Sequence, residues 1–272
     1  MVIVCLRVEH LSRVIGIVSG KGGVGKTTFA INLGIALSRF GKKVVVVDCN
    51  ITTPHLAYYL GAENYSVTLN NVFRGEVDVK FAPLEREGVM FIPASEDIKD
   101  LIKIDIMNLK RHVAKLSNNS FYDYIILDSA PGLGREALSV FQACEEIIFV
   151  TTPTIPTLTD VTRCAEVASQ MGHRRFNIVL NMVRNKDYEL RALDAGNLFR
   201  TPILGTIPFD ESVMDSTSLG IPFLSYKPDS AVQNSYMEIA ANLIGVRYKK
   251  SSKLRRIYRR MKRLIKREKK VL

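Results

Sequence analysis

Short apolar runs rich in Val and Ile recur along the chain, and longer segments with an apolar residue every three or four positions separate them. Most of the short runs lack the two-residue alternation of a half-exposed strand, so they predict parallel strands covered on both faces. The expected strands are Val14–Ser19, Lys43–Val47, Met90–Ile92, Tyr124–Asp128, Glu146–Thr151, Asn177–Asn181 and Ile203–Ile207.

The longer segments predict helices that alternate with these strands. The expected helices are Phe29–Leu37, ending near Gly41, then Ile98–Leu116, Arg135–Ala143, Pro156–Met171, Tyr188–Leu198, Glu211–Leu219 and Asp229–Ile244. Such alternation indicates an α/β fold with a doubly wound, mostly parallel sheet. Sheets of this kind bind ligands at the carboxyl ends of their strands.

The chain divides into three parts of unequal size. Residues 1–13 are expected to be an N-terminal extension or an extra strand, 14–246 the α/β domain, and 247–272 a basic tail. From Lys249 to Leu272 the tail holds thirteen Lys or Arg and one acid, whereas the rest of the chain is close to neutral. The tail therefore accounts for the net charge of +11. This asymmetry indicates an anionic partner for the tail.

A glycine-rich segment lies between the first expected strand and the first expected helix. Its sequence, Gly20-Lys21-Gly22-Gly23-Val24-Gly25-Lys26-Thr27-Thr28, satisfies the pattern G-x-x-x-x-G-K-[ST]. In this pattern the glycines let backbone N–H groups cradle phosphate oxygens, the lysine adds a positive charge, and the hydroxyl after it reaches Mg²⁺. The segment therefore predicts the phosphate-binding loop of a P-loop NTPase.

Polar residues that suit a nucleotide site follow three other expected strands. Asp128 ends the apolar run Tyr124–Leu127, which is the Walker-B arrangement for holding Mg²⁺, and Asp48 ends a second run. Gly132, in the turn after Asp128, is expected to bring a backbone N–H near a γ-phosphate. Asn181 ends a third strand, where an amide can pair with the edge of adenine, although Asn ends strands for other reasons as well.

Lys21–Thr28 resembles the deviant Walker-A motif of the MinD/ParA ATPases, whose additional lysine stands where Lys21 does. The likeness continues in the same order, from about Val14 to Gly245. It runs through Asp48–Leu56, Phe91–Ser95, Tyr122–Asp128, Leu180–Val183 and Ile207–Asp210. The MinD branch is the most similar one. The resemblance implies ATP and Mg²⁺ as cofactors and an ATP-dependent homodimer, in which Lys21 reaches the partner's nucleotide.

Carried onto this chain, the resemblance implies a set of site residues. The nucleotide contacts are Gly22, Gly23, Val24, Gly25, Lys26, Thr27, Thr28, Gly132, Asn181, Pro208 and Asp210. The magnesium ligands are Thr27, Asp48 and Asp128, and the catalytic residues are Lys21, Lys26, Asp48 and Asn50. The family's switch strand usually ends Asp-x-Asp, whereas here it ends Asp48-Cys49-Asn50. Because an amide lacks the charge that polarises water, slow ATP hydrolysis is expected.

The basic tail has the pattern of an amphipathic helix. On a helical wheel its apolar residues fall on one arc about 120° wide. These residues are Leu254, Ile257, Tyr258, Met261, Leu264, Ile265 and Leu272. A helix with such a stripe and a dense Lys/Arg face lies in the interface of an anionic membrane, as the MinD resemblance also implies. Nucleic acid and a protein surface are the alternatives, but binding phosphates requires no aligned apolar residues.

The length of the apolar runs and the spacing of the cysteines exclude two classes of protein. The chain has no apolar run of about 18 residues, so no membrane-spanning helix is predicted. The four cysteines, Cys5, Cys49, Cys144 and Cys164, include no C-x-x-C pair, which the iron–sulfur carriers of the family have. We expect a cytoplasmic MinD-like ATPase on the inner face of the cell membrane, which positions division or another cell-surface assembly with a protein activator. A DNA-binding partition ATPase and a non-hydrolysing ATP-binding adaptor are the alternatives.

Overall fold

The computed structural model describes residues 12–62, 65–102, 104–118 and 121–249. The predicted amphipathic tail and nearly all of the predicted N-terminal extension lie outside the described residues. In the part that is described, none of the helices has the length and apolar character needed to cross a membrane.

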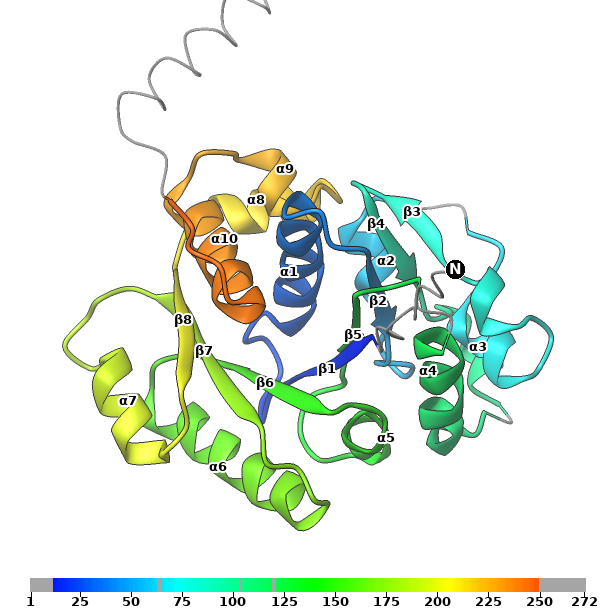
Figure 1. Cartoon of the computed structure of the whole chain (residues 1–272), viewed down its shortest axis with the longest axis horizontal. Coiled ribbons are helices and arrows are strands. Elements are labelled where there is room, and N and C mark those ends of the chain that lie inside the picture. Colours follow the sequence, from blue (N-terminus) through cyan, green and yellow to red (C-terminus); the bar gives the residue numbers. More distant parts are fainter. Residues whose placement is uncertain (1–11, 63–64, 103, 119–120, 250–272) are drawn as a thin grey trace, which may run out of the picture.

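In the described residues an eight-stranded sheet runs through the centre, in the order β3-β4-β2-β5-β1-β6-β7-β8 (Figure 1). The strands are β1 Arg13–Val18, β2 Val44–Asp48, β3 Leu84–Arg86, β4 Val89–Ile92, β5 Tyr124–Asp128, β6 Glu146–Thr151, β7 Phe176–Val183 and β8 Ile203–Pro208. Neighbouring strands pair in parallel, except that β3 is antiparallel to β4. The predicted doubly wound, mostly parallel sheet is confirmed.

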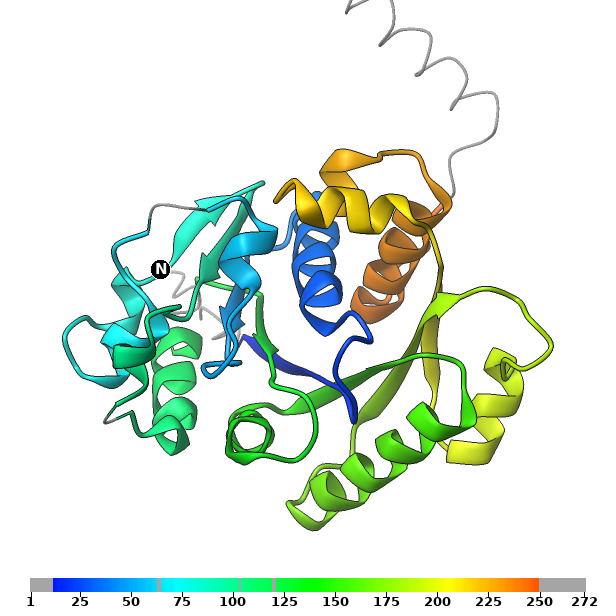
Figure 2. The ribbon, with the colours of Figure 1, turned by 180° about the vertical axis from the view of Figure 1, so that it is seen from behind.

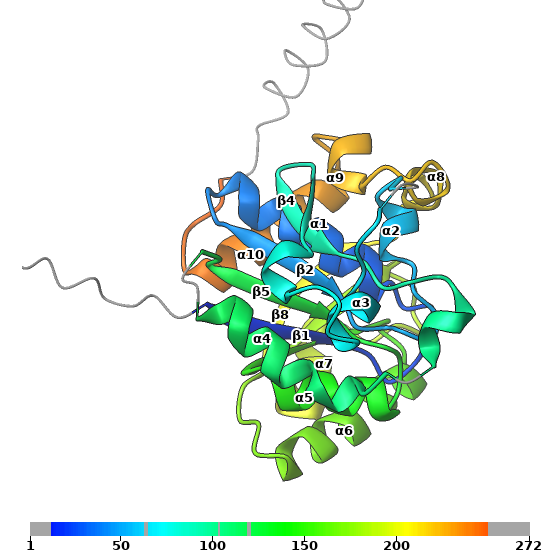
Figure 3. The same cartoon turned by 90° about the vertical axis from the view of Figure 1, so that its right-hand side faces the viewer.

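Helices cover both faces of this sheet (Figures 1 and 2). They are α1 Lys26–Arg39, α2 Leu56–Tyr59, α3 Leu69–Phe73, α4 Leu109–Ser117, α5 Arg135–Ala143, α6 Ile155–Gln170, α7 Ala192–Phe199, α8 Ser212–Ser218, α9 Phe223–Tyr226 and α10 Ala231–Ile244, with short 3₁₀ turns at Val79–Phe81, Ile98–Leu101 and Ile106–Asn108. In the side view, α1 and α10 lie on one face and α5 and α6 on the other (Figure 3).

The two layers explain why the strands show no two-residue alternation. Along β2, Val44 and Val46 pack into the apolar core under α1 and α10, whereas Val45 and Val47 pack into the core under α4, α5 and α6. All four side chains are buried. Both faces of the strand therefore need apolar residues, as is usual for parallel sheets.

The single helix predicted over Ile98–Leu116 is wrong. The structure has two 3₁₀ turns there, and α4 begins only at Leu109. The side chain of Asp97 accepts a hydrogen bond from Lys99 N–H, and that of Asp105 accepts one from Met107 N–H. Such local side-chain bonds compete with helix formation.

Other differences concern element ends and short elements. The helix predicted over Tyr188–Leu198 begins at Ala192, and the first helix begins at Lys26 rather than Phe29. The prediction also lacked β3 and the short helices α2, α3 and α9. β3 and β4 form a hairpin through the two-residue turn Glu87-Gly88, both with positive φ. Asn-Gly or Asp-Gly usually marks such a turn, and Glu87 takes the place of the Asn or Asp here.

A candidate nucleotide site

The glycine loop joins β1 directly to the N-terminus of α1. Gly25 has a φ of 89°, a left-handed conformation that favours glycine, and helix α1 begins at the next residue, Lys26. A Cβ atom on Gly25 would lie 2.5 Å from Nδ2 of Asn181. That Nδ2 donates a 2.8 Å hydrogen bond to the Val24 carbonyl oxygen. The strand end of β7 therefore holds the loop in place, and the loop presents a helix N-terminus, which attracts anions.

Two buried carboxylates lie beside each other below this loop. Asp48 ends β2 and Asp128 ends β5, and the two residues are paired in the register of these strands. Asp48 accepts hydrogen bonds from the backbone N–H groups of Asn50 and Leu56. Both carboxylate oxygens of Asp128 lack a hydrogen-bond partner among the described residues. A buried carboxylate without a partner is costly and marks a place for a cation.

Burial changes the protonation of these groups. It raises the pKa of Asp128 to about 6, although the nearby Thr27 hydroxyl and Lys26 ammonium act in the opposite direction. Burial and then the charge of Asp128 raise the pKa of Asp48 well above its ordinary value. Burial also lowers the pKa of Lys26, against the attraction of Asp128. Ion and phosphate binding would relieve both kinds of burial cost, so these residues fit a phosphate-bound divalent cation.

The loop after β2 carries Asn50 into the same cleft. A cavity of about 260 Å³ is lined by the glycine loop together with Asn50, Thr53, His55, Tyr59 and Pro131. Nδ2 of Asn50 donates to the Thr53 carbonyl oxygen at 2.5 Å, and the Thr53 hydroxyl donates to Oδ1 of Asn50 at 3.1 Å. The predicted site residues do not include Thr53, His55, Tyr59 and Pro131, although Thr53 and His55 lie in the segment Asp48–Leu56 that resembles the family.

Gly132 and Lys21 lie at the rim of the site. Gly132 has a φ of 77°, and its N–H donates a 2.9 Å hydrogen bond to the carbonyl oxygen of Ser19, just before the glycine loop. This N–H group is therefore engaged with protein, although the prediction placed it near a phosphate. The side chain of Lys21 is exposed, and no ion pair is formed by it with the described residues.

A small second cavity of about 50 Å³ adjoins the phosphate cleft, because Gly25 and Thr28 line both. Its other lining residues are Asn181, Met182, Ile207, Pro208, Phe209, Asp210, Val213, Met214, Val232 and Tyr236. The structure thus brings the predicted Asn181, Pro208 and Asp210 together with the glycine loop. The Asp210 carboxylate is paired with Lys227 at 3.0 Å. The wall of this cavity is largely apolar, as in most ligand pockets, but its volume is well below theirs.

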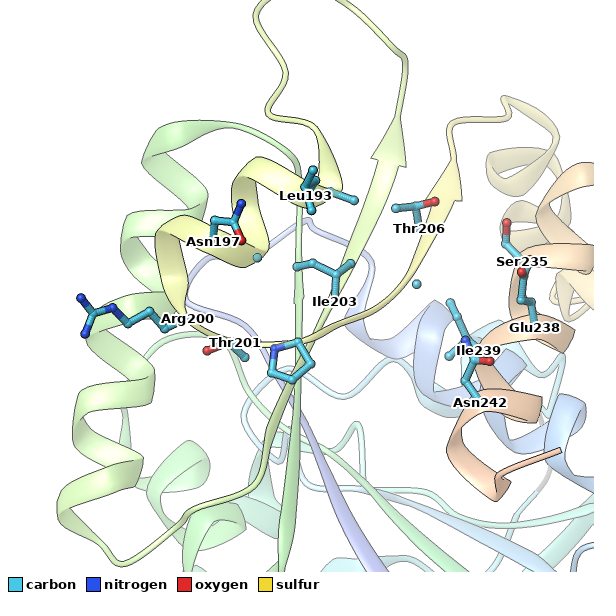
Figure 4. A pocket seen from close by; sticks show the side chains of 14 residues that line it. Leu193, Asn197, Arg200, Thr201, Ile203, Thr206, Ser235, Glu238, Ile239 and Asn242 are labelled. Carbon is cyan, nitrogen blue, oxygen red and sulfur yellow. The ribbon is translucent and has the colours of Figure 1, made fainter. Parts of the chain in front are cut away.

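A larger groove of about 780 Å³ lies away from the glycine loop, at the β8 edge of the sheet between α7 and α10 (Figure 4). Leu193 and Asn197 border it on one side, and Ser235 and Asn242 on the other. None of the predicted site residues lines this groove. The largest of these cavities therefore contains neither the glycine loop nor the buried carboxylates.

A self-contained metal centre is not present in the part of the chain that the structure describes. No group of three or more His, Cys, Asp and Glu side chains there is arranged to hold a metal ion. Cys49, Cys144 and Cys164 are buried free thiols. Magnesium that is bound through a nucleotide needs only one or two protein carboxylates, since phosphates and waters supply the other ligands. The pair Asp48 and Asp128 meets that requirement.

The known proteins that resemble the chain over most of its length include an ATP-binding protein and two MinD proteins. An uncharacterized ATP-binding protein of Methanocaldococcus jannaschii is 34% identical over 235 residues, which cover 86% of this chain and 88% of that protein. The cell division ATPase MinD of Pyrococcus furiosus is 33% identical with a TM-score of 0.82, covering 86% of this chain and 99% of the other. The septum site-determining protein MinD of Pyrococcus horikoshii, complexed with Mg-ADP, is 33% identical with a TM-score of 0.81, covering 86% and 96%.

A family model agrees with these likenesses. The model for ParA, described as NUBPL iron-transfer P-loop NTPase, matches residues 10–244. That range contains the glycine loop, both buried carboxylates and the whole sheet. The chain belongs to the ParA family of P-loop NTPases, with MinD proteins among its relatives of similar sequence and fold.

Proposed function

We propose that this chain is a MinD-like ATPase that binds Mg-ATP and switches between a monomer and an ATP-bound dimer at the membrane. The observation that carries the proposal is the buried Asp128 carboxylate, which has no hydrogen-bond partner among the described residues and lies beside Asp48 under the glycine loop. A magnesium ion with a nucleotide would neutralise both acids.

Each part of the site has a task in this proposal. The backbone N–H groups of the glycine loop and Lys26 bind the phosphates, while Thr27, Asp48 and Asp128 hold the metal with its waters. The base would lie against the apolar wall beside Gly25 and Thr28, next to Asn181, Pro208 and Asp210. When bound, the metal and the lysine stabilise the negative charge that builds up during phosphoryl transfer.

Two charged features, Lys21 and the basic tail, account for the proposed dimer and for its binding to the membrane. The exposed Lys21 can approach the nucleotide bound to a second copy of the chain. Its ammonium group would then contact the phosphates of that nucleotide, so dimerisation depends on ATP. The tail, with its apolar residues Leu254, Ile257 and Met261, would bind an anionic membrane weakly in a monomer. Two tails in one dimer bind together, and effective concentration then strengthens attachment by about 10²–10⁴-fold. ATP binding is thereby coupled to the membrane.

The proposed role is spatial. A protein that attaches to the inner membrane surface only in its ATP-bound form can place cell division or another surface assembly. The relatives named cell division ATPase and septum site-determining protein support this role. A protein activator that promotes ATP hydrolysis completes the proposed cycle.

A non-hydrolysing ATP-binding adaptor is the second candidate, and Asn50 favours it. Its side chain takes the place of a carboxylate and is hydrogen-bonded to Thr53 in its own loop. Members of the family generally hydrolyse ATP, and turnover by this chain, measured with anionic lipid vesicles present, separates the two candidates.

Titration calorimetry tests the proposed site directly. The protein should bind ATP with Mg²⁺ and bind it less tightly in EDTA. Lys26→Ala removes a charge-assisted contact to phosphate, worth about 1.5–3 kcal/mol, or roughly 10–150-fold in affinity. The matched control Lys42→Ala lies after α1, at the far end from the glycine loop, and should bind as the parent does. Equal affinity of parent and Lys26→Ala would overturn the site assignment.

A further inference from the structure

One side chain ties the loop after β2 to helix α5. Oε1 of Glu136 accepts two hydrogen bonds from Thr52, one from its backbone N–H at 2.8 Å and one from its hydroxyl at 2.7 Å. The two residues are 84 positions apart in the sequence. In the described part of the chain, no other side-chain hydrogen bond joins this loop to α5.

The loop that Glu136 holds also contains Asn50. The side chains of Asn50 and Thr53 are joined by two hydrogen bonds, so residues 50–53 form a small closed unit. Both Asn50 and Thr53 line the phosphate cleft. Thr52 itself is exposed, so packing restrains it little. A displacement of Thr52 would therefore be passed to Asn50 through this unit.

The other end of the connection lies just after Gly132. Glu136 lies in the first turn of α5, where a carboxylate is favoured by the helix dipole. Gly132 comes four residues earlier, and its N–H is bonded to Ser19 at the base of the glycine loop. The stretch between them is exposed at Leu133 and Gly134. A change at Gly132 can thus move the start of α5 and, through Glu136, the Asn50 loop.

We propose that Glu136 is a positioning residue, which couples the turn at Gly132 to the water-positioning loop at Asn50 through its bonds to Thr52. This proposal rests on the proposed ATPase function and deepens it, because it names how a movement of the turn at Gly132 would reach Asn50. Glu136 does not reach the cleft itself, since it is absent from the residues that line it. Its effect is on turnover and on the motion of the loop rather than on nucleotide affinity.

The test compares four variants with the parent: Glu136→Ala, Glu136→Gln, Thr52→Val and the double variant Glu136→Ala/Thr52→Val. Mg-ATP affinity is measured by calorimetry and steady-state turnover by phosphate release with anionic vesicles. Hydrogen exchange at residues 50–56 is followed with ADP and with a slowly hydrolysed ATP analogue. Glu166→Ala, an exposed acid on α6, is the matched control.

Glu136→Ala should leave Mg-ATP affinity within about threefold and lower kcat by about fivefold or more, because the loop loses its attachment while the glycine loop is intact. Glu136→Gln should recover most of kcat, since its amide oxygen still accepts from Thr52. The double variant should be no slower than the slower single variant, because both remove one connection. Glu166→Ala should match the parent.

Exchange at the Thr52 amide should rise in Glu136→Ala, and the difference between ADP and the ATP analogue across residues 50–56 should disappear. An unchanged kcat together with a preserved nucleotide-dependent difference would overturn the proposal, as would multiplying effects of the two single variants. A parent that binds Mg-ATP without turnover contradicts the proposed hydrolysis, but exchange still decides the role of Glu136.

Discussion

Replacing Asp128 by Asn should stabilise the nucleotide-free protein while removing its response to magnesium nucleotide. The carboxylate is buried beside Asp48, interacts with the charge of Lys26, and has no hydrogen-bond partner in the described part of the chain. The apo fold therefore carries an unfavourable charge that the ligand would neutralise. The substitution Asp128→Asn keeps the shape of the side chain and removes this charge.

The size of the gain follows from the pKa of Asp128. It is about 6 in the fold and about 3.9 in an unfolded chain, so at pH 7.5 the ionised group costs about 3 kcal/mol. The buried amide of the variant would lack a partner as well, and this cost offsets part of the gain. The free energy of unfolding should therefore rise by about 2 kcal/mol in Asp128→Asn. For a domain of this size that is a rise in Tm of about 4–8 °C.

The sign of the pH dependence provides a second check. Because the folded pKa is raised, the folded state holds a proton that the unfolded state has lost between about pH 4 and 6. The stability of the parent should therefore fall as the pH rises through this window, and Asp128→Asn should flatten the fall. The charge of Asp128 also raises the pKa of Asp48, so its removal reduces that contribution too.

Thermal melts in EDTA and in Mg-ATP measure both effects. The parent should gain stability from Mg-ATP according to ligand concentration and affinity, whereas the variant should gain little. A variant that is less stable than the parent in EDTA at pH 7.5, or that responds to Mg-ATP as the parent does, would refute the reasoning.

Three further predictions address the dimer, catalysis and the tail. Lys21→Ala should keep most of the monomer's nucleotide binding and lose ATP-dependent dimerisation in light scattering; a dimer of normal stability returns Lys21 to the role of a solvated loop residue. Asn50→Asp should raise turnover by part of the roughly 10²–10⁴-fold that a positioned base contributes, and an equal or lower rate would show that water is positioned by other means. Replacing Ile257, Met261 and Leu264 by Gln keeps the charge of the tail and should abolish ATP-dependent liposome binding; unchanged binding would make the tail a simple basic patch.

The fold and the phosphate loop could be predicted because their signals are local. The glycine pattern occupies eight consecutive residues, Gly20–Thr27, and runs of Val and Ile mark the buried strands without reference to any distant partner. Asp48 and Asp128 could be assigned because each directly follows such a run. Their adjacency in the sheet then follows from the order of the parallel strands.

The parts that could not be predicted depend on distant contacts. The bond of Asn181 to Val24 spans 157 positions and that of Glu136 to Thr52 spans 84, so no window of the sequence contains either pair. The apolar spacing of residues 98–116 predicts one helix, whereas the structure has two 3₁₀ turns before α4. Ile98 is nevertheless 80% exposed, and capping by Asp97 sets the local structure.

Liposome co-sedimentation with ATP and with ADP tests the central claim most directly, because it joins the nucleotide site to the tail in one measurement. The account predicts that the full chain sediments with anionic vesicles in Mg-ATP and stays largely in the supernatant in Mg-ADP. The Lys26→Ala variant should sediment to the same extent in ATP and in ADP. Equal sedimentation of the parent in ATP and ADP, or an unaltered response in Lys26→Ala, would contradict a membrane switch operated by this site.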